Sequence, residues 1–210
     1  MYLAPEINKT LCDNENLFLG NHTYTTVTRR LGKIFNFPKD LKFKFETFGD
    51  IAENDFTVSG LYDMFFNKKY VILNFSDKQK TLNLDKYTID PFFFLISQTI
   101  QHESIHQHQW ANREPEDEAV QLDFRMISGT LQEEREYLSD IDEIDAYAHD
   151  IAMEIKRYYS HKNPYEVLRN IQKTRKIDSY NYYRRTFSKC DWNKIKKQLY
   201  KKIYNWIPHA

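Results

Sequence analysis

Two histidines and a glutamate stand together in the run His-Glu-Ser-Ile-His at residues 102–106. His102 and His106 are four residues apart, so on a helix they lie on one face, one turn apart. Two imidazoles placed in this way can bind one zinc ion. Zinc lowers the pKa of a bound water to about 7, and Glu103 can accept the proton of that water as the oxygen attacks a carbonyl carbon. The pattern predicts a zinc-dependent peptidase, and its alternative is two surface histidines that bind no metal.

A third protein ligand is needed, because a catalytic zinc site takes three protein ligands and one water. We favour Glu143, which lies beside an apolar stripe on the next strongly helical segment, where the small Ala146 would let the motif helix come close. Asp142 and Asp140 are the alternatives among the acids. In a second interpretation, Asp140 and Glu143 form a capping box, and Glu143 only binds a backbone N–H. The remaining candidates are histidines: His22, His108, His149 and His161.

The elements around the motif can be predicted from hydrophobic periodicity. The motif falls in a helix expected over residues 91–110, with Asp90 as its N-cap and Pro91 at its first position. Alternating or β-branched runs predict strands before it, and further helices are expected near Ser139, Asn163 and Asp191. The expected strands are Leu41–Glu46, Phe56–Leu61, Lys69–Phe75 and Thr81–Leu84, the last paired with the third. Residues 1–21 are expected to be irregular, followed by a short helix over Thr25–Phe35 that Pro38 ends.

This order of elements predicts an α+β fold. A small, mostly antiparallel sheet is followed by the motif helix, the helix with the third ligand and C-terminal helices. We expect a metallopeptidase domain over residues 1–160 and a basic helical extension over residues 161–210 that packs on it. Five glycines in 210 residues argue against Gly-rich phosphate loops.

Composition also bears on the compartment and on partners. Cys12 and Cys190 form neither a disulfide framework nor a cysteine zinc site, which is typical of a reducing compartment such as the cytoplasm. No signal peptide is recognisable at residues 1–10, and the apolar run Pro91–Ile96 is too short to cross a bilayer, so we expect no membrane partner.

The charges are strongly segregated although the net charge is zero. Residues 111–150 carry 13 acidic and 3 basic side chains, a balance of −10, and residues 151–210 carry 4 acidic and 15 basic ones, a balance of +11. Two solvated faces that attract each other explain this distribution most simply. The alternative is a basic C-terminal surface that binds nucleic acid or an acidic partner.

The motif and its surroundings resemble the zincin metallopeptidases, and within them the gluzincins, in which a glutamate on a following helix completes a His-His-Glu site. Thr99 and the uncharged residues at 100, 104, 105 and 107 fit the extended zincin pattern, whereas His108 departs from it. The run from Asp142 to Ala148 resembles the third-ligand helix of small bacteriophage-type metallopeptidases. The resemblance covers about residues 69–155.

The resemblance implies zinc as cofactor, a peptide or protein as substrate and Glu143 as the third ligand. Gluzincins usually place a Tyr or His near the zinc to stabilise the oxyanion, and Tyr147, four residues after Glu143, is our candidate, with Tyr182, Tyr183 and Arg184 as alternatives. Zincins hold their substrate on an edge strand, here expected at Thr81–Leu84. Two other functions remain open: a zincin-fold binding or regulatory protein with little turnover, and a SprT-like protease that acts on nucleic-acid-bound proteins.

Overall fold

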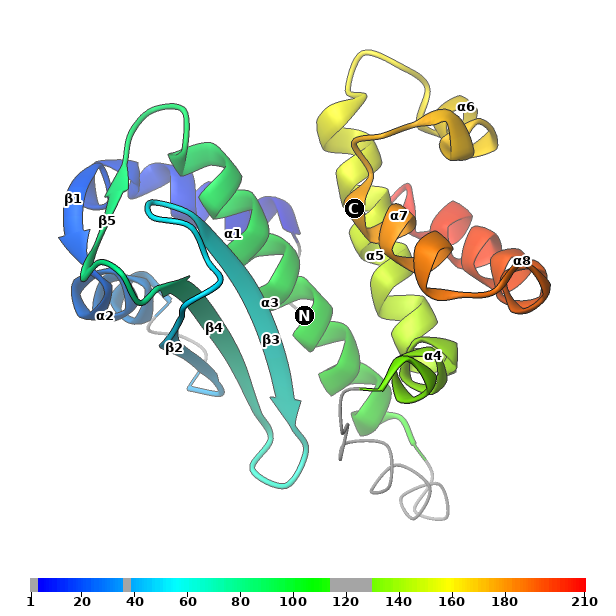
Figure 1. Ribbon diagram of the computed structural model, residues 1–210, viewed down its shortest axis with the longest axis horizontal. Coiled ribbons are helices and arrows are strands. Elements are labelled where there is room, and N and C mark those ends of the chain that lie inside the picture. Colours follow the sequence, from blue (N-terminus) through cyan, green and yellow to red (C-terminus); the bar gives the residue numbers. More distant parts are fainter. Residues whose placement is uncertain (1–3, 36–38, 114–129) are drawn as a thin grey trace. The chain divides into compact units, whose positions relative to one another are not determined.

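The structure is a computed structural model, and it describes residues 4–35, 39–113 and 130–210 (Figure 1). It divides into two compact units, unit 1 over Met1–His108 and unit 2 over Gln109–Ala210. Among the described residues, every strand belongs to unit 1, and unit 2 is built from helices. The predicted α+β class is therefore confirmed. The units divide inside the motif helix, whereas the sequence suggested a domain boundary at residue 160.

Unit 1 contains the strands and the motif helix. Its elements in chain order are α1 (Ala4–Asp13), η1 (Glu15–Leu17), β1 (Gly20–Thr23), α2 (Tyr24–Ile34), β2 (Leu41–Phe48), β3 (Phe56–Asp63), β4 (Lys68–Ser76), β5 (Thr81–Leu84) and α3 (Ile89–Ala111), the last of which continues into unit 2. The strands predicted at β2, β3, β4 and β5 and the helices predicted at α2 and α3 are confirmed. Pro38, expected to end α2, lies outside the described residues.

A three-stranded sheet in the order β2-β4-β3 lies next to α3 in unit 1 (Figure 1). Strand β4 is central because its alternating residues Val71, Leu73 and Phe75 are fully buried. Strand β3 pairs antiparallel with β4, through a turn in which Asn67 takes the left-handed backbone region at φ 48°. Strand β2 pairs parallel with β4. Strand β3 is therefore an edge strand of this sheet.

The predicted pairing of Thr81–Leu84 with Lys69–Phe75 is wrong. Strand β5 pairs antiparallel with β1, with Gly20 opposite Leu84, in a separate two-stranded sheet. The physical reason is that β2 and β3 already occupy both edges of β4. The expectation that residues 1–21 are irregular is also wrong, because Ile7 and Leu11, one turn apart on α1, are fully buried.

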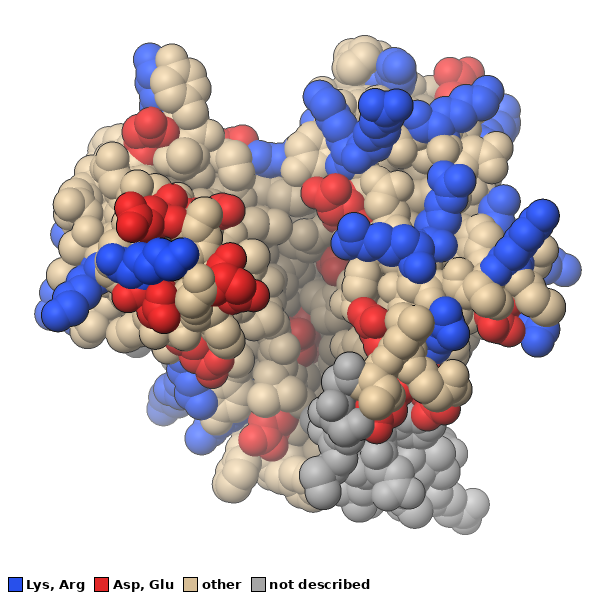
Figure 2. Space-filling model, in the orientation of Figure 1, with Lys and Arg blue, Asp and Glu red and all other residues tan. Residues whose placement is uncertain are grey.

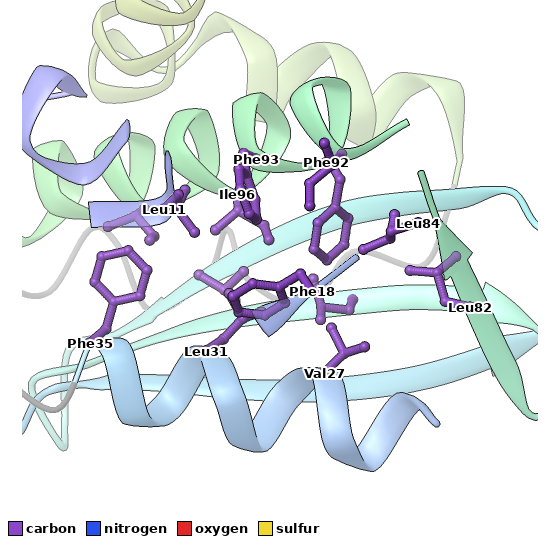
Figure 3. Close-up of a cluster of buried hydrophobic side chains, with 14 of the residues drawn as sticks. Leu11, Phe18, Val27, Leu31, Phe35, Leu82, Leu84, Phe92, Phe93 and Ile96 are labelled. Atoms are coloured by element: carbon purple, nitrogen blue, oxygen red, sulfur yellow. The ribbon is translucent and has the colours of Figure 1, made fainter. Parts of the chain in front are cut away.

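The core of unit 1 lies between α3 and α2 (Figure 3). Phe92 and Ile96 on α3 point toward Val27 and Leu31 on α2, and Phe18 fills the space between them. All five side chains are fully buried. This packing fixes the first half of α3, and with it the direction in which the helix presents the residues of its second half.

Unit 2 is a bundle of helices around α5. Its elements are α4 (Leu131–Ser139), α5 (Ile141–Tyr158), α6 (Pro164–Arg169), η3 (Ile171–Lys173), α7 (Asp178–Thr186) and α8 (Lys189–Trp206). Ile144, Ile151 and Ile155 on α5 share one buried cluster with Leu199 and Ile203 on α8, so residues 161–210 pack on the same core as α5. Helix α8 buries Ile195, Leu199 and Ile203 along one face.

Two helix starts in this unit differ from the sequence prediction. Helix α8 begins two residues before Asp191, with Ser188 as its N-cap, and Asp191 donates its backbone N–H to the Ser188 side chain. Helix α4 was not anticipated, although Thr130 and Glu133 form a full capping box at its start. A sequence search for that box would have found it.

Candidate metal centre

Helix α3 carries the motif on a segment that is mostly buried. It begins at Ile89, so that Asp90 lies in its first turn rather than at its N-cap. The apolar residues of its first half are followed by buried polar side chains. These polar residues are Ser97, Gln98, Gln101, His102, Glu103 and Ser104. Burying so many polar groups in one helix is costly unless they find partners. Such a buried polar stretch is typical of a functional site and not of a solvated helix surface.

His102 and His106 lie together as the spacing predicts. Their ring centroids are 4.9 Å apart and their planes are inclined by 71°. The His102 side chain is buried, with 9% of its surface exposed, and His106 is half-buried. Two solvated surface histidines would be more exposed than these. The burial therefore favours a pair that could bind a ligand over two surface histidines without a role. Both residues belong to unit 1.

Glu103 lies directly against the backbone of the edge strand β3. A Cβ atom added to Gly60 would stand 2.7 Å from both Cγ and Cδ of Glu103, and closer still to Oε1. Ordinary contacts between carbon atoms are about 3.5–4.0 Å, so any side chain at position 60 would require Glu103 or the strand to shift. Glu103 is 5% exposed. The strand and the carboxylate are therefore fitted to each other, a relation that the sequence analysis missed.

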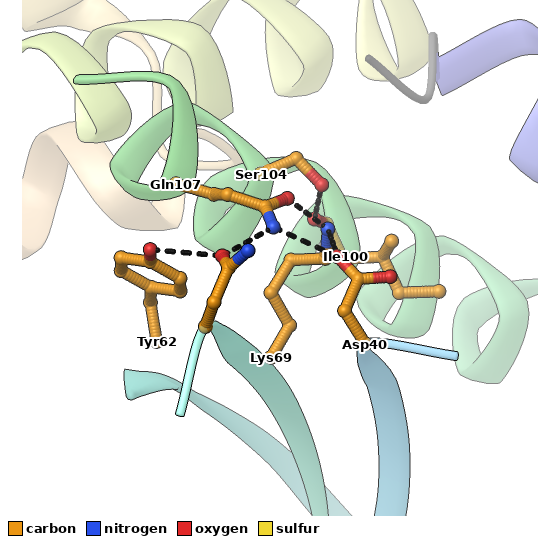
Figure 4. A network of polar contacts seen from close by, with 7 residues as sticks. Asp40, Tyr62, Lys69, Ile100, Ser104 and Gln107 are labelled. Carbon is orange, nitrogen blue, oxygen red and sulfur yellow. Dashed lines mark hydrogen bonds and ion pairs between the residues drawn. The ribbon is translucent and has the colours of Figure 1, made fainter. Parts of the chain in front are cut away.

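A polar network around the buried Lys69 fixes the end of α3 to the sheet (Figure 4). The Lys69 ammonium donates to Asp40 Oδ2 over 2.7 Å and also to Gln107 Oε1. Gln107 Nε2 donates to Asp40 Oδ2 and to Asn67 Oδ1, each over 2.8 Å. Tyr62 donates its hydroxyl to Asn67 Oδ1 over 3.1 Å. The residue after His106 is thus tied to the starts of β2 and β4 and to the β3–β4 turn.

The sequence held a signal for this network. Lys69 stands in register with the core residues of β4 and its side chain is only 3% exposed. A lysine at an inward position of an alternating strand needs a buried partner, and Asp40 is that partner. Burial raises the pKa of Asp40, but the hydrogen bonds from Lys69 and Gln107 and the Lys69 charge lower it by more, so the pKa lies below the ordinary 3.8.

Glu143 lies in unit 2, in the first turn of α5, and is half-buried. Its competitors for the role of third ligand have other contacts in the same unit. The Asp140 carboxylate caps α5 by accepting the backbone N–H of Asp142 over 2.8 Å, and the Asp142 carboxylate forms an ion pair with Arg113. Ala146 is fully buried on α5, as the packing of this helix requires.

Three tyrosines gather beside Glu143 in unit 2. The Tyr147 ring lies 5.2 Å from that of Tyr183 and 6.1 Å from that of Tyr182, measured between centroids. Tyr182 donates its hydroxyl to Glu134 over 2.6 Å. The Tyr183 hydroxyl is buried without a hydrogen-bond partner among the described residues. Burial, and then the nearby Tyr147 and Glu143, hold the pKa of Tyr183 well above its usual range.

Four other predicted candidates are described by their contacts and exposure within their own units. Within unit 1, His22 Nε2 lies 2.9 Å from the Leu19 carbonyl oxygen. Within unit 2, His149 is buried against Trp206, with ring centroids 4.9 Å apart, and His161 is exposed. Arg184 is exposed and donates to the Gln172 carbonyl. None of these contacts suggests a metal ligand.

Comparison with protein families, with curated proteins and with solved structures finds no match to this chain. The chemistry of the candidate centre is therefore inferred from its own residues. Among the described residues, no helix has the length and apolar character needed to span a membrane.

Proposed function

We propose that this chain is a zinc-dependent peptidase of the zincin type, in which His102, His106 and Glu143 hold one zinc ion. The observation that carries the proposal is the pair of imidazoles on a buried part of α3, with their centroids 4.9 Å apart and Glu103 between them in sequence. The donors fit the metal, because imidazole nitrogen and carboxylate oxygen are ligands that zinc takes in catalytic sites.

The choice of Glu143 is supported by contacts inside unit 2. Gln109 follows His106 by three residues on the continuous helix α3. Its side-chain amide donates to the Asp142 carbonyl over 3.2 Å and lies 3.5 Å from Asp145 Oδ2. Arg113, just after the helix, pairs with the Asp142 carboxylate. The first turn of α5, which contains Glu143, is thus bonded to the last turn of α3, and the Asp142 carboxylate takes part in that contact.

A bound zinc would supply an activated water and would polarise the scissile carbonyl. Glu103 would act at its carboxylate as the general base that accepts a proton and as the acid that returns it to the leaving amine. Its low exposure keeps bulk water away from the carboxylate and strengthens its electrostatic effect. Tyr147, half-buried and four residues after Glu143, is the proposed donor to the oxyanion.

The substrate is proposed to pair with β3, not with β5. Strand β3 is an edge strand, and its backbone at Gly60 lies against Glu103. An extended peptide added to this edge would therefore run close to the general base. The expected substrate strand Thr81–Leu84 was predicted to pair with β4, but β5 pairs with β1 in another sheet.

The second candidate is a zincin-fold binding or regulatory protein with little turnover. The burial of Glu103 under an edge strand that can take a peptide argues against it, because a binding protein has no need of the base. A cytoplasmic location is proposed on the two cysteines, which are both free and exposed, as expected in a reducing compartment.

The proposal is tested by comparing the zinc-loaded protein with its Glu103→Gln variant. The variant keeps the shape of the side chain and no metal ligand changes, so its zinc content should equal that of the parent. Its rate of cleavage of an unfolded protein substrate should fall by about 10²–10⁴, the usual contribution of general acid–base catalysis. A loaded parent protein that cleaves no peptide across a broad substrate set would favour the binding function instead.

A further inference from the structure

We propose that unit 2 binds single-stranded nucleic acid along the exposed face of α8. This inference is independent of the peptidase proposal, because it rests on residues outside the candidate metal centre. Lys194, Lys197 and Lys201 follow one another at spacings of three and four, and Tyr204 continues the series. These four exposed residues, called the lysine stripe below, lie on one face of the helix. The buried stripe of Ile195, Leu199 and Ile203 faces the other way.

The lysine stripe lies in a larger basic surface. Figure 2 shows lysine and arginine side chains gathered over α6, α7 and α8 of unit 2. Among the described residues of 151–210, eleven basic side chains are exposed, against two acidic ones, Glu166 and Asp178. The exposed basic residues are Lys162, Arg169, Lys173, Arg175, Lys176, Arg184, Arg185, Lys189, Lys194, Lys197 and Lys201. An excess of this size attracts a polyanion.

Ion pairs among the described residues do not account for the stripe. Among the described residues, Lys202 in the basic segment 151–210 forms an ion pair of 3.1 Å with Asp145 in the acidic segment 111–150. Lys194 lies 3.6 Å from Asp191, whereas Lys197 and Lys201 have no ion-pair partner in the described part of the chain. Like charges three and four residues apart destabilise a helix. Their concentration on one face is therefore better explained by an external anion than by helix stability.

The aromatic residues decide which polyanion fits best. A helix that binds an anionic membrane surface needs Trp, Phe or Leu exposed beside its lysines. In the described residues of 151–210, the large hydrophobic side chains that are exposed are Tyr158 and Tyr204, at 37% and 58%. Tyrosines between basic side chains are suited to stacking on unpaired bases. Tyr204 stands next to Lys201 on the stripe, so one strand could place phosphates on the lysines and a base on the ring.

The binding is tested with the full chain and a fluorescently labelled oligothymidine of about 20 nucleotides, long enough for a site of about 4–16 nucleotides. The anisotropy is measured as a function of salt. Replacing Lys194, Lys197 and Lys201 by Gln should lower the salt slope by about 2, since each phosphate contact to a single strand contributes about 0.7. At about 0.1 M salt, the same change should weaken binding roughly 100-fold. Tyr204→Ala should weaken it by about 5- to 100-fold with an unchanged salt slope.

The matched control removes the same charge from unit 1, by replacing the exposed Lys78, Lys80 and Lys86 with Gln. It should bind the oligonucleotide within about twofold of the parent. Polyglutamate and vesicles of phosphatidylserine serve as competing polyanions. The proposal is overturned if the stripe variant binds like the parent, if the control loses as much affinity, or if polyglutamate or vesicles bind as tightly as the oligonucleotide. A loss of zinc or of peptidase activity alone would bear on the metal centre and not on this surface.

Discussion

Replacing Gly60 by alanine tests whether the edge strand positions the general base. The added Cβ would stand 2.7 Å from Cγ and Cδ of Glu103, against an ordinary contact of about 3.5–4.0 Å. The carboxylate or the strand must therefore move by roughly 1 Å. A misplacement of this size in a catalytic group can lower the rate about 100-fold. The overlap should also reduce the free energy of unfolding by about 1–3 kcal/mol.

The assay measures kcat on an unfolded protein substrate, zinc content and urea unfolding for the same preparation. We expect Gly60→Ala to bind zinc like the parent, since no ligand is changed, and to lose kcat. Gly32→Ala is the matched control, because a Cβ at Gly32 meets no atom within 4 Å. In the last turn of helix α2 this control should raise stability by up to about 1 kcal/mol and leave kcat unchanged. A Gly60→Ala protein with the kcat of the parent would refute the fit between Gly60 and Glu103.

Three further predictions concern the polar network and the third ligand. Lys69→Met should lower the free energy of unfolding by about 1–3 kcal/mol, because the partly exposed Asp40 carboxylate loses its ammonium partner. Adding Asp40→Asn should restore most of that loss in urea unfolding. The folded-state pKa of Asp40 is lowered, so its contribution to the free energy of unfolding is present above about pH 4 and is lost as the pH falls through the folded-state pKa. Asp40→Asn should therefore flatten the acid limb of the curve of stability against pH. Glu143→Gln should weaken zinc binding in a competition assay with a chelator, whereas Asp142→Asn should leave zinc affinity within about threefold of the parent and lower stability instead. The reverse ranking of these two variants would make Asp142 the ligand.

The elements with strong local patterns could be predicted from the sequence. The β-branched run of β4, the long helix α3 and the stripe of α8 each carry their period in consecutive residues, so neighbouring positions reinforce one another. His102 and His106 could be brought together in the same way, because one helix turn fixes their distance.

Relations between distant residues could not be predicted. The pairing of β5 with β1 joins Gly20 to Leu84, and which edge is available depends on the strands that already flank β4. The contact of Gly60 with Glu103 and the bonds of Lys69 to Asp40 and Gln107 span 29 or more positions of the sequence. No local hydrophobic period records such contacts. The sequence did hold two signals: a lysine at an inward position of β4 indicates a buried partner, and a glycine inside β3 indicates the close approach of another group.

The central claim is that His102 and His106 hold a metal ion, and metal analysis of the purified chain tests it most directly. The parent protein, equilibrated with zinc and then dialysed, should retain about one zinc per chain. His102→Ala and His106→Ala should each retain almost none, while His149→Ala, which changes a buried histidine in unit 2, should retain as much as the parent wherever it folds. Retention of a full equivalent of zinc by both motif variants would contradict the account.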